Sequence, residues 1–216
     1  VYMKTVKGPL KVDCIYRRLD DSFLDPKAFN KASVIGVPGL FKCWRKGNVG
    51  ILNAIGTGVA DDKVVYSYVN KMIVYYLGEQ PILNQVETYL CHEKIQRDYV
   101  IDNISKLVVK PANASGGYGI MIGPKAPLKE RQEVINKIKK NPREFIAQPL
   151  EILSTAPTIT ENDIEPRHLD LRPFVLSGKT SYVTTGGLTR VALRKGSTIV
   201  NSSQGGGSKD TLIVDM

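Results

Sequence analysis

Cysteine and histidine are scarce in this sequence, and it has no long apolar run. Three cysteines are scattered through 216 residues without CxxC spacing, and there are two histidines. So few cysteines, odd in number, argue against a disulfide framework and against a structural zinc site. The longest uninterrupted apolar stretch, Met72 to Leu77, is far shorter than the ~20 residues of a membrane-spanning helix. No secretory signal is visible, so we expect a cytoplasmic protein that does not enter a membrane.

Acidic residues are also comparatively few. The chain has 30 Lys and Arg against 21 Asp and Glu, which gives a formal net charge of +9. This charge suggests an anionic partner, which could be nucleic acid, a phosphorylated small molecule or an acidic protein segment. The basic residues form no stripe with interleaved aromatics, and those in 125–143 lie on a predicted helix whose charges should face water. Nucleic acid is therefore not favoured.

The predicted elements alternate between helix and strand, and the chain then becomes strand-rich. Apolar periodicity predicts helices at 61–78, 93–104 and 127–141. Short apolar or alternating runs predict strands at 11–17, 49–53, 107–110, 120–122 and 145–148, antiparallel strands between 168 and 201, and a polar Gly-rich loop at 202–210. We expect a stripe on the first helix to belong to the core: Val65, Val69, Met72 and Tyr76. The order predicts an α+β fold with antiparallel sheets rather than a doubly wound parallel sheet.

The most informative segment is LVVKPANASGGYGIMIG, at 107–123. A strand ending in Lys110 meets a loop of small residues before a second strand, and the loop contains Ser115, Gly116, Gly117 and Gly119. Glycines let backbone N–H groups approach phosphate oxygens, and a nearby lysine neutralises them. No GK[ST] follows, and the glycines lead into a strand, so this is neither a P-loop nor a Rossmann fingerprint. A phosphate site is favoured over a plain hairpin, because a lysine on an apolar strand needs an anionic partner.

The segment NAIGTGVADDK, at 53–63, invites a dinucleotide interpretation. Asp61 and Asp62 oppose it, because their carboxylates would repel a pyrophosphate at the helix N-terminus. They are more simply helix-capping residues. Lys63 lies in the first turn of the predicted helix, where its positive charge opposes the helix dipole. Its presence there suggests a separate role.

The strand-rich end carries five further residues to consider. His168, Asp170 and Arg172 share one strand face by period 2, and the Asp/Arg pair is either a structural ion pair or a clamp for phosphate or carboxylate. Arg190 and Asn201 lie at strand ends beside glycines. Arginine is a natural partner for a transferring phosphoryl group, and asparagine oxygen can bind Mg²⁺.

A group of aspartates near the N-terminus, Asp20, Asp21 and Asp25, could hold Mg²⁺. The neighbouring Arg17 and Arg18 favour a solvated turn instead.

A series of strings in this order resembles the circularly permuted ATP-grasp proteins of type 2, whose relatives by chemistry are glutathionylspermidine synthase-like amide ligases. The strings are DCIYRRLDDSFLDP, GVPGL, GTGVADDK, VVKPANASGGYG, IAQP, PRHLDLRPFVLSG, GGLTRVAL and VNSSQGGGSKDT. The resemblance implies an ATP-grasp-like α+β fold, in which two subdomains of antiparallel sheet with flanking helices clamp ATP. It also implies amide formation: ATP phosphorylates a carboxylate, and an amine displaces phosphate from the acyl phosphate.

The resemblance also implies roles for individual residues. It assigns the ATP phosphates to Lys63, Lys110 and the loop that contains Ser115, Gly116, Gly117 and Gly119. It places Gln148 at the adenine edge, Asp170 in the nucleotide site, Arg190 and Arg172 at the transferring phosphate, and Asn201 at Mg²⁺.

One part of the family pattern is missing from the sequence. The acidic segment EDNxRxPSG, expected to hold Mg²⁺ in the N-terminal half of such proteins, does not occur. We therefore expect a C-terminal half: 1–50 continuing from a missing part, 51–145 as the subdomain with the Gly-rich loop, and 146–216 as the second subdomain. Alone it should bind nucleotide weakly and react poorly.

The implied partners are ATP, a carboxylate, an amine, the missing half, and α-E-type or transglutaminase-like proteins. A non-catalytic nucleotide- or partner-binding module is the alternative, followed by a basic nucleic-acid-binding domain.

Overall fold

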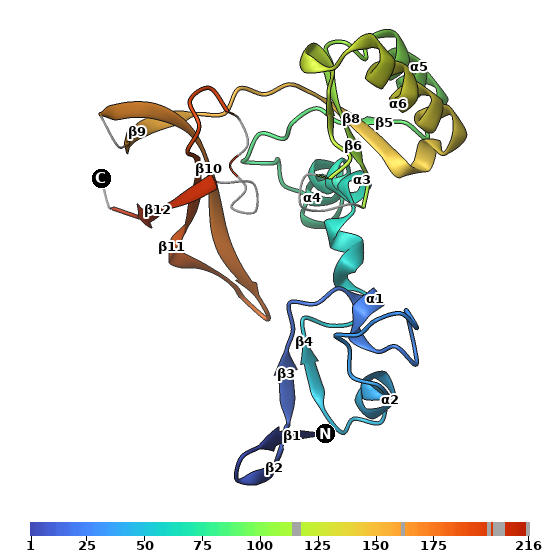
Figure 1. The fold of residues 1–216 in the computed structure, drawn as a ribbon, viewed down its shortest axis with the longest axis vertical. Coiled ribbons are helices and arrows are strands. Elements are labelled where there is room, and N and C mark those ends of the chain that lie inside the picture. The colour runs from blue at the N-terminus through green and yellow to red at the C-terminus, as the bar shows by residue number, and fades with distance from the viewer. Residues whose placement is uncertain (114–117, 161–162, 198–199, 201–205, 215–216) are drawn as a thin grey trace. The chain divides into compact units, whose positions relative to one another are not determined.

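The structure, a computed structural model, describes residues 1–113, 118–160, 163–197, 200 and 206–214. Contacts divide the chain into two compact units, Val1–Gln85 and Val86–Met216. Helices and mainly antiparallel sheets occur in both, so the predicted α+β class is confirmed (Figure 1). The predicted subdomain boundaries at 50 and 145 stay predictions.

The first unit begins with two small strand pairs. β1 (Tyr2–Thr5) and β2 (Gly8–Lys11) form an antiparallel hairpin, and β3 (Cys14–Tyr16) pairs in parallel with β4 (Gly50–Leu52). The predicted single strand at 11–17 is therefore wrong at its start. Two short helices lie between β3 and β4, α1 (Asp21–Leu24) and α2 (Leu40–Arg45). A small core joins them to the strands through Leu24, Leu40, Val49 and Ile51.

The predicted helix at 61–78 is broken in the structure. A 3-10 helix η1 (Thr57–Asp61) precedes α3 (Lys63–Tyr66), and α4 (Val69–Leu77) follows after another break. Asp62 causes the first interruption: its backbone is extended, and its carboxylate accepts a hydrogen bond from the N–H of Val64 at 2.9 Å. Such a side chain starts a new helix rather than continuing one. The predicted capping role is thus confirmed for Asp62.

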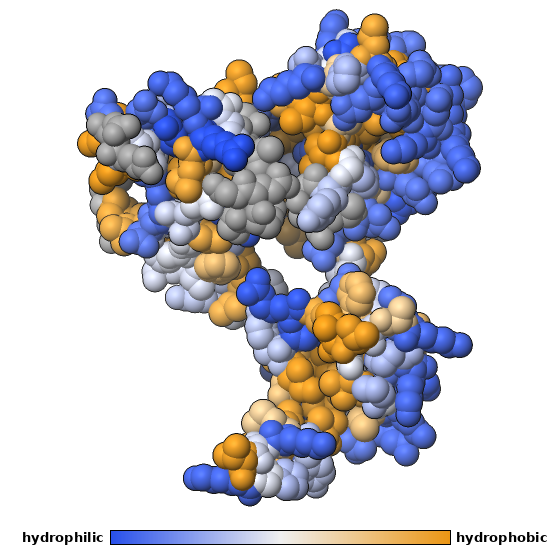
Figure 2. Space-filling model, viewed as in Figure 1, coloured by the Kyte–Doolittle hydropathy of each residue, from blue (hydrophilic) through white to orange (hydrophobic). Residues whose placement is uncertain are grey.

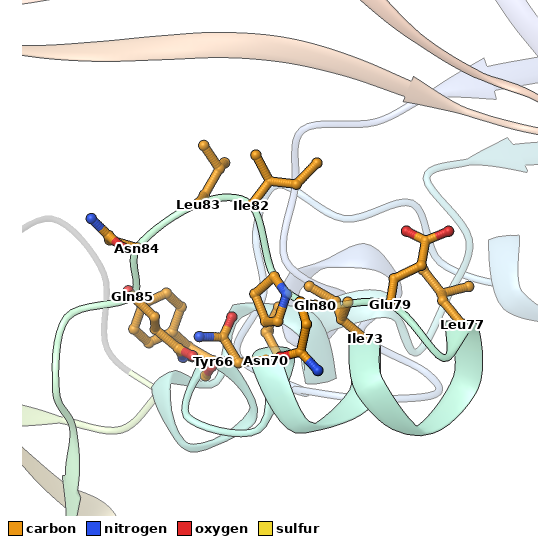
Figure 3. A pocket seen from close by; sticks show the side chains of 12 residues that line it. Tyr66, Asn70, Ile73, Leu77, Glu79, Gln80, Ile82, Leu83, Asn84 and Gln85 are labelled. Carbon is orange, nitrogen blue, oxygen red and sulfur yellow. Dashed lines mark hydrogen bonds between the residues drawn. The ribbon is translucent and has the colours of Figure 1, made fainter.

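The expected core stripe on this segment is wrong as well. Val69 and Tyr76 are 38% and 74% exposed. Instead, α4 and the chain that returns along it at 79–85 line an open pocket of about 430 Å³. In Figure 3, Ile82 and Leu83 point away from the helix rather than into it. The apolar periodicity therefore marked a helix correctly but not its burial.

The second unit contains a four-stranded antiparallel sheet with helices on one face. Its strand order is β5 (Tyr89–Leu90), β8 (Phe145–Pro149), β6 (Leu107–Pro111) and β7 (Met121–Ile122). Helices α5 (Lys94–Asp102) and α6 (Leu128–Lys140) pack on it through a core that includes Val100, Val109, Ile138 and Ala147 (Figure 1). The short 3-10 helices η2 (Gly123–Lys125) and η3 (Pro142–Glu144) flank α6. Each of these longer elements matches its prediction within two residues.

The outer side of the two helices is hydrophilic, as Figure 2 shows. Most charged side chains of α6 are exposed, while Val134 and Ile138 are buried. This confirms that the basic residues of the helix face water.

A second antiparallel sheet forms the end of the chain. Its order is β12 (Gly206–Leu212), β11 (Ser181–Ala192), β10 (Ile164–Ser177) and β9 (Thr155–Ile159). Two expectations are corrected here. Residues 181–192 form one strand rather than two, and 206–210 of the predicted Gly-rich loop belong to β12. Pairing with β11 explains the second correction, because the sheet supplies backbone hydrogen-bond partners that local sequence does not.

Candidate functional site

A partly buried chain of hydrogen bonds connects two predicted site residues. The Lys110 ammonium donates to Oε1 of Gln148 at 2.6 Å, and Nε2 of Gln148 donates to Oγ1 of Thr88 at 2.9 Å. The Thr88 hydroxyl donates in turn to the carbonyl oxygen of Val86 at 3.0 Å. Because a lysine can only donate, the oxygen of the Gln148 amide must face Lys110 and its nitrogen must face Thr88. The carboxamide is therefore held in one orientation.

The register of the sheet brings these side chains together. Val108 lies opposite Gln148 and Lys110 lies opposite Ile146 on the antiparallel strands β6 and β8. Side chains alternate along a strand, so all four share the face turned away from α5 and α6. Val108 and Ile146 are buried, and Gln148 is 8% exposed. Lys110 thus stands half-buried among apolar neighbours, with an amide dipole fixed beside it.

Sequence reasoning missed Thr88. It belongs to none of the strings that carry the resemblance, and its segment, 86–88, has no turn or phosphate signal. Its place beside Gln148 follows from β5 lying next to β8 in the sheet, with Tyr89 opposite Ala147. Only the pairing of the strands reveals this contact.

The glycine-rich loop is described only at its end. Gly119 has a φ of +72°, and a Cβ placed there would lie 2.9 Å from Cγ of Pro111. Both the backbone conformation and the close approach require glycine at this position. Ser115, Gly116 and Gly117 lie outside the described residues, as does Asn201.

Lys63, the other predicted phosphate ligand, is the first residue of α3 and belongs to the first unit. Burial lowers the pKa of its ammonium, while the charges of Asp62 and Asp61 act in the opposite direction. Lys110 and Gln148 belong to the second unit.

Asp170 and Arg172 form an ion pair on β10. The guanidinium approaches the carboxylate through Nε and Nη2, with the shortest contact at 2.9 Å. Arg190 lies directly opposite Asp170 on β11, so two arginines flank one carboxylate on this face. Nδ1 of His168 donates a hydrogen bond to the carbonyl oxygen of Leu153 at 2.7 Å. The predicted common face is confirmed, and the structural ion pair is present.

The three N-terminal aspartates do not converge on one point. Asp20 accepts from the N–H and Oγ of Ser22, and Asp21 pairs with Arg17 at 2.5 Å. Asp25 accepts hydrogen bonds from three backbone N–H groups. Within the described part of the chain, no group of three or more His, Cys, Asp or Glu could hold a metal ion. These residues therefore do not form a magnesium site.

In the same described part, no helix has the length and apolar character to cross a membrane.

Comparison with known proteins places these residues in context. The family model described as "Circularly permuted ATP-grasp type 2" matches residues 1–192. An uncharacterized protein of Synechocystis is 55% identical over 98% of this chain and 44% of its own length. An uncharacterized protein of Mycobacterium tuberculosis is 54% identical over 99% of this chain and 39% of its own length. The chain thus spans less than half the length of these relatives.

A Frankia casuarinae protein that carries the printed name "Putative glutamate--cysteine ligase 2-2" is 49% identical over 94% of this chain. The match covers 23% of that protein, so its name describes a much longer polypeptide.

Proposed function

Because this chain belongs to the circularly permuted ATP-grasp type 2 family, we propose that it is the nucleotide-binding half of an ATP-dependent ligase. The observation that carries the proposal is the chain of contacts from Lys110 through Gln148 to Thr88. It holds a cation in a set position on an otherwise apolar sheet face. A cation fixed in advance loses less conformational freedom on binding phosphate, and the low local dielectric strengthens its attraction.

The described residues fit a nucleotide better than a metal. Lys110 would bind a phosphate of ATP, and Gly119 lets the end of the glycine-rich loop pass close beside the strand that carries this lysine. Ser115, Gly116 and Gly117 would cover the β- and γ-phosphates with their backbone N–H groups. Gln148 was assigned to the adenine edge, but its contacts support a role in positioning Lys110. Among the described residues, no group of three or more His, Cys, Asp or Glu could hold Mg²⁺.

The proposed reaction forms an amide. A carboxylate oxygen of the substrate attacks the γ-phosphorus of ATP, the bond to the β-phosphate oxygen breaks, and ADP leaves. An amine then attacks the carbonyl carbon of the acyl phosphate, loses a proton, and displaces inorganic phosphate. Lys63, Lys110 and Arg190 would each stabilise negative charge that is redistributed in the two steps, and so would Arg172, which pairs with Asp170. Asp170 would hold the two arginines in place.

The rest of a longer protein would complete this site. More than half of the length of each of these relatives lies outside the part that matches this chain. We propose that this additional part supplies further Mg²⁺ ligands, beside Asn201, and part of the substrate site. The printed name of the Frankia relative is compatible with a carboxylate and an amine as substrates. The same proposal includes two further points. The ligase would be similar in chemistry to glutathionylspermidine synthases, and its partner proteins would be of the α-E type or transglutaminase-like.

Titration calorimetry with ATP and Mg²⁺ tests the assignment in the full-length protein. Lys110→Ala should weaken ATP binding about 10- to 100-fold, because one charged hydrogen bond contributes roughly 1.5–3 kcal/mol. Lys139→Ala on the exposed side of α6 removes the same charge elsewhere and should leave the affinity unchanged. Equal affinities for the two variants would overturn the proposed site. ATP binding without phosphate release, across candidate amines and carboxylates, would instead indicate a non-catalytic binding module.

A further inference from the structure

A second pocket lies in the first unit, formed by two segments that are apart in the sequence. Side chains from the segments 25–28 and 39–46 line an open pocket of about 630 Å³. This is within the range of about 300–1,000 Å³ that is typical of small-molecule sites. We call it the basic pocket, because four of its lining residues are cationic: Lys27, Lys42, Arg45 and Lys46.

The spacing of these cations is unfavourable without a counter-charge. Lys42, Arg45 and Lys46 follow one another at i, i+3 and i+4 on and just after α2, so their charges repel. The C-terminal end of the short helix offsets part of this repulsion. Lys27 comes from another segment, two residues after Asp25, the C-cap of the four-residue helix α1. In the part of the chain that the structure describes, none of the four has an ion-pair partner.

The single acidic residue that lines the basic pocket, Asp25, accepts its hydrogen bonds from backbone N–H groups. The Asp25 carboxylate is 1% exposed and accepts from the N–H groups of Lys27 at 2.8 Å and of Gly39 and Phe41 at 3.0 Å each. Because these contacts use both of its oxygens, Asp25 joins the two segments of the pocket wall. The pocket wall is therefore held in place by hydrogen bonds. Four cationic side chains line it, and the buried Asp25 carboxylate is its one negative charge.

One aromatic ring lines the same pocket, and two further rings pack against it. Phe41 lines the pocket, with Arg45 over its ring at 5.9 Å, and it stacks on Trp44 at 5.6 Å. Phe29 contacts Phe41 edge-on at 5.2 Å. The apolar surface can contact the body of an organic ligand while the cations contact its charged groups.

We propose that the basic pocket binds a small organic anion with at least two negative charges, either a phosphate ester or a polycarboxylate. Both share the chemistry that the pocket recognises. None of its lining residues is among those of the proposed ATP site, which include Lys63 and Lys110.

Trp44 provides a direct optical readout. It is the only tryptophan of the 216-residue chain, and it stacks on a ring of the pocket wall. Titration with phosphoglycolate and with citrate, at constant ionic strength set with chloride, should change its fluorescence saturably. Saturation by the first alone assigns a phosphate ester, and saturation by citrate alone assigns a polycarboxylate.

Matched variants separate the pocket from general electrostatics. The double variant Lys42→Gln, Arg45→Gln should weaken anion binding at least about tenfold, since each exchange removes a charged contact. Lys4→Gln and Lys7→Gln together remove the same charge from the β1–β2 hairpin and should have no effect. Lys110→Ala should also leave it unchanged, so this proposal and the ATP site can fail independently.

Three outcomes would overturn the proposal. The first is that neither anion gives a saturable fluorescence change at millimolar concentration. The second is that the pocket variant and the hairpin variant bind the anion equally well. The third is that an acidic peptide binds while both small anions fail to bind, which would make this face a protein-binding surface. Circular dichroism of each variant confirms that the fold is intact.

Discussion

Replacing Asp25 with asparagine should destabilise the first unit strongly, although the two side chains have nearly the same shape. One carboxylate oxygen accepts from the N–H groups of Lys27 and Gly39, and the other accepts from Phe41. In Asp25→Asn the amide nitrogen would face one of these donors, leaving that N–H buried without an acceptor. The remaining hydrogen bonds lose their charge. Burial raises the pKa of Asp25, but the three N–H groups and the Lys27 ammonium outweigh it and leave the pKa below its usual value.

The size of the effect follows from these contacts. An unsatisfied buried N–H costs about 1–3 kcal/mol, and a hydrogen bond to a charged group contributes roughly 1 kcal/mol more than a neutral one. We therefore expect the free energy of unfolding to fall by about 2–4 kcal/mol. With an m-value of about 2 kcal/mol/M, the urea midpoint should shift by roughly 1–2 M. Trp44 fluorescence reports this transition, because its side chain packs on the small core of the same unit.

Acid provides a second test of the same carboxylate. A folded-state pKa below the unfolded value of about 3.9 means that Asp25 contributes stability above that value, and that this is lost as pH falls through the folded pKa. The difference between wild type and Asp25→Asn should therefore shrink below about pH 4. Asp13→Asn, at an exposed carboxylate paired with Lys11, is the control and should shift the midpoint little. An Asp25→Asn midpoint within about 0.3 M of wild type at pH 7 would refute the reasoning.

Three further changes have definite expected outcomes. Burial raises the pKa of the Cys91 thiol to about 12, so it should resist Ellman's reagent at pH 8 until the chain unfolds, while the exposed Cys14 reacts at once; equal native rates would contradict this. Thr88→Val removes the acceptor of a buried amide and should cost about 1–2 kcal/mol in chemical unfolding and weaken ATP binding, and an unchanged protein would exclude a positioning role. Gly119→Ala adds a clash with the adjacent proline ring to a strained φ, so it should lower the melting temperature more than Gly196→Ala, which has a similar φ of +71° and no atom within 4 Å; the reverse order would be incompatible with this geometry.

Local sequence signals located the longer elements of the second unit. The apolar periodicity of α5 and α6 and the apolar runs of β6 and β8 gave their positions, because each of these segments has one face or side in the core. The same signals failed where non-local pairing decided the outcome. Residues 206–210 were predicted as a loop but belong to β12, and the parallel pairing of β3 with β4 joins strands far apart in the chain.

The candidate site divides in the same way. A lysine on an apolar strand predicted an anionic partner for Lys110, and the contact in the structure is with the neutral carboxamide of Gln148. That Gln148 is this partner depends on the register of β6 against β8, and Thr88 depends on β5 lying beside β8. The basic pocket had no motif at all, since its cations come from two segments that the Asp25 carboxylate joins by hydrogen bonds.

The sequence by itself determined the chemistry that the chain carries: an excess of cations, a glycine-rich loop after a lysine, and a family pattern that lies in ordered strings. These are properties of residue type and short spacing, which local sequence encodes. The tertiary structure alone decided which of these residues meet. Strand register places Gln148 against Lys110, and a buried carboxylate joins the two segments whose cations line one pocket, because contacts across the chain depend on pairing and packing rather than on neighbouring residues.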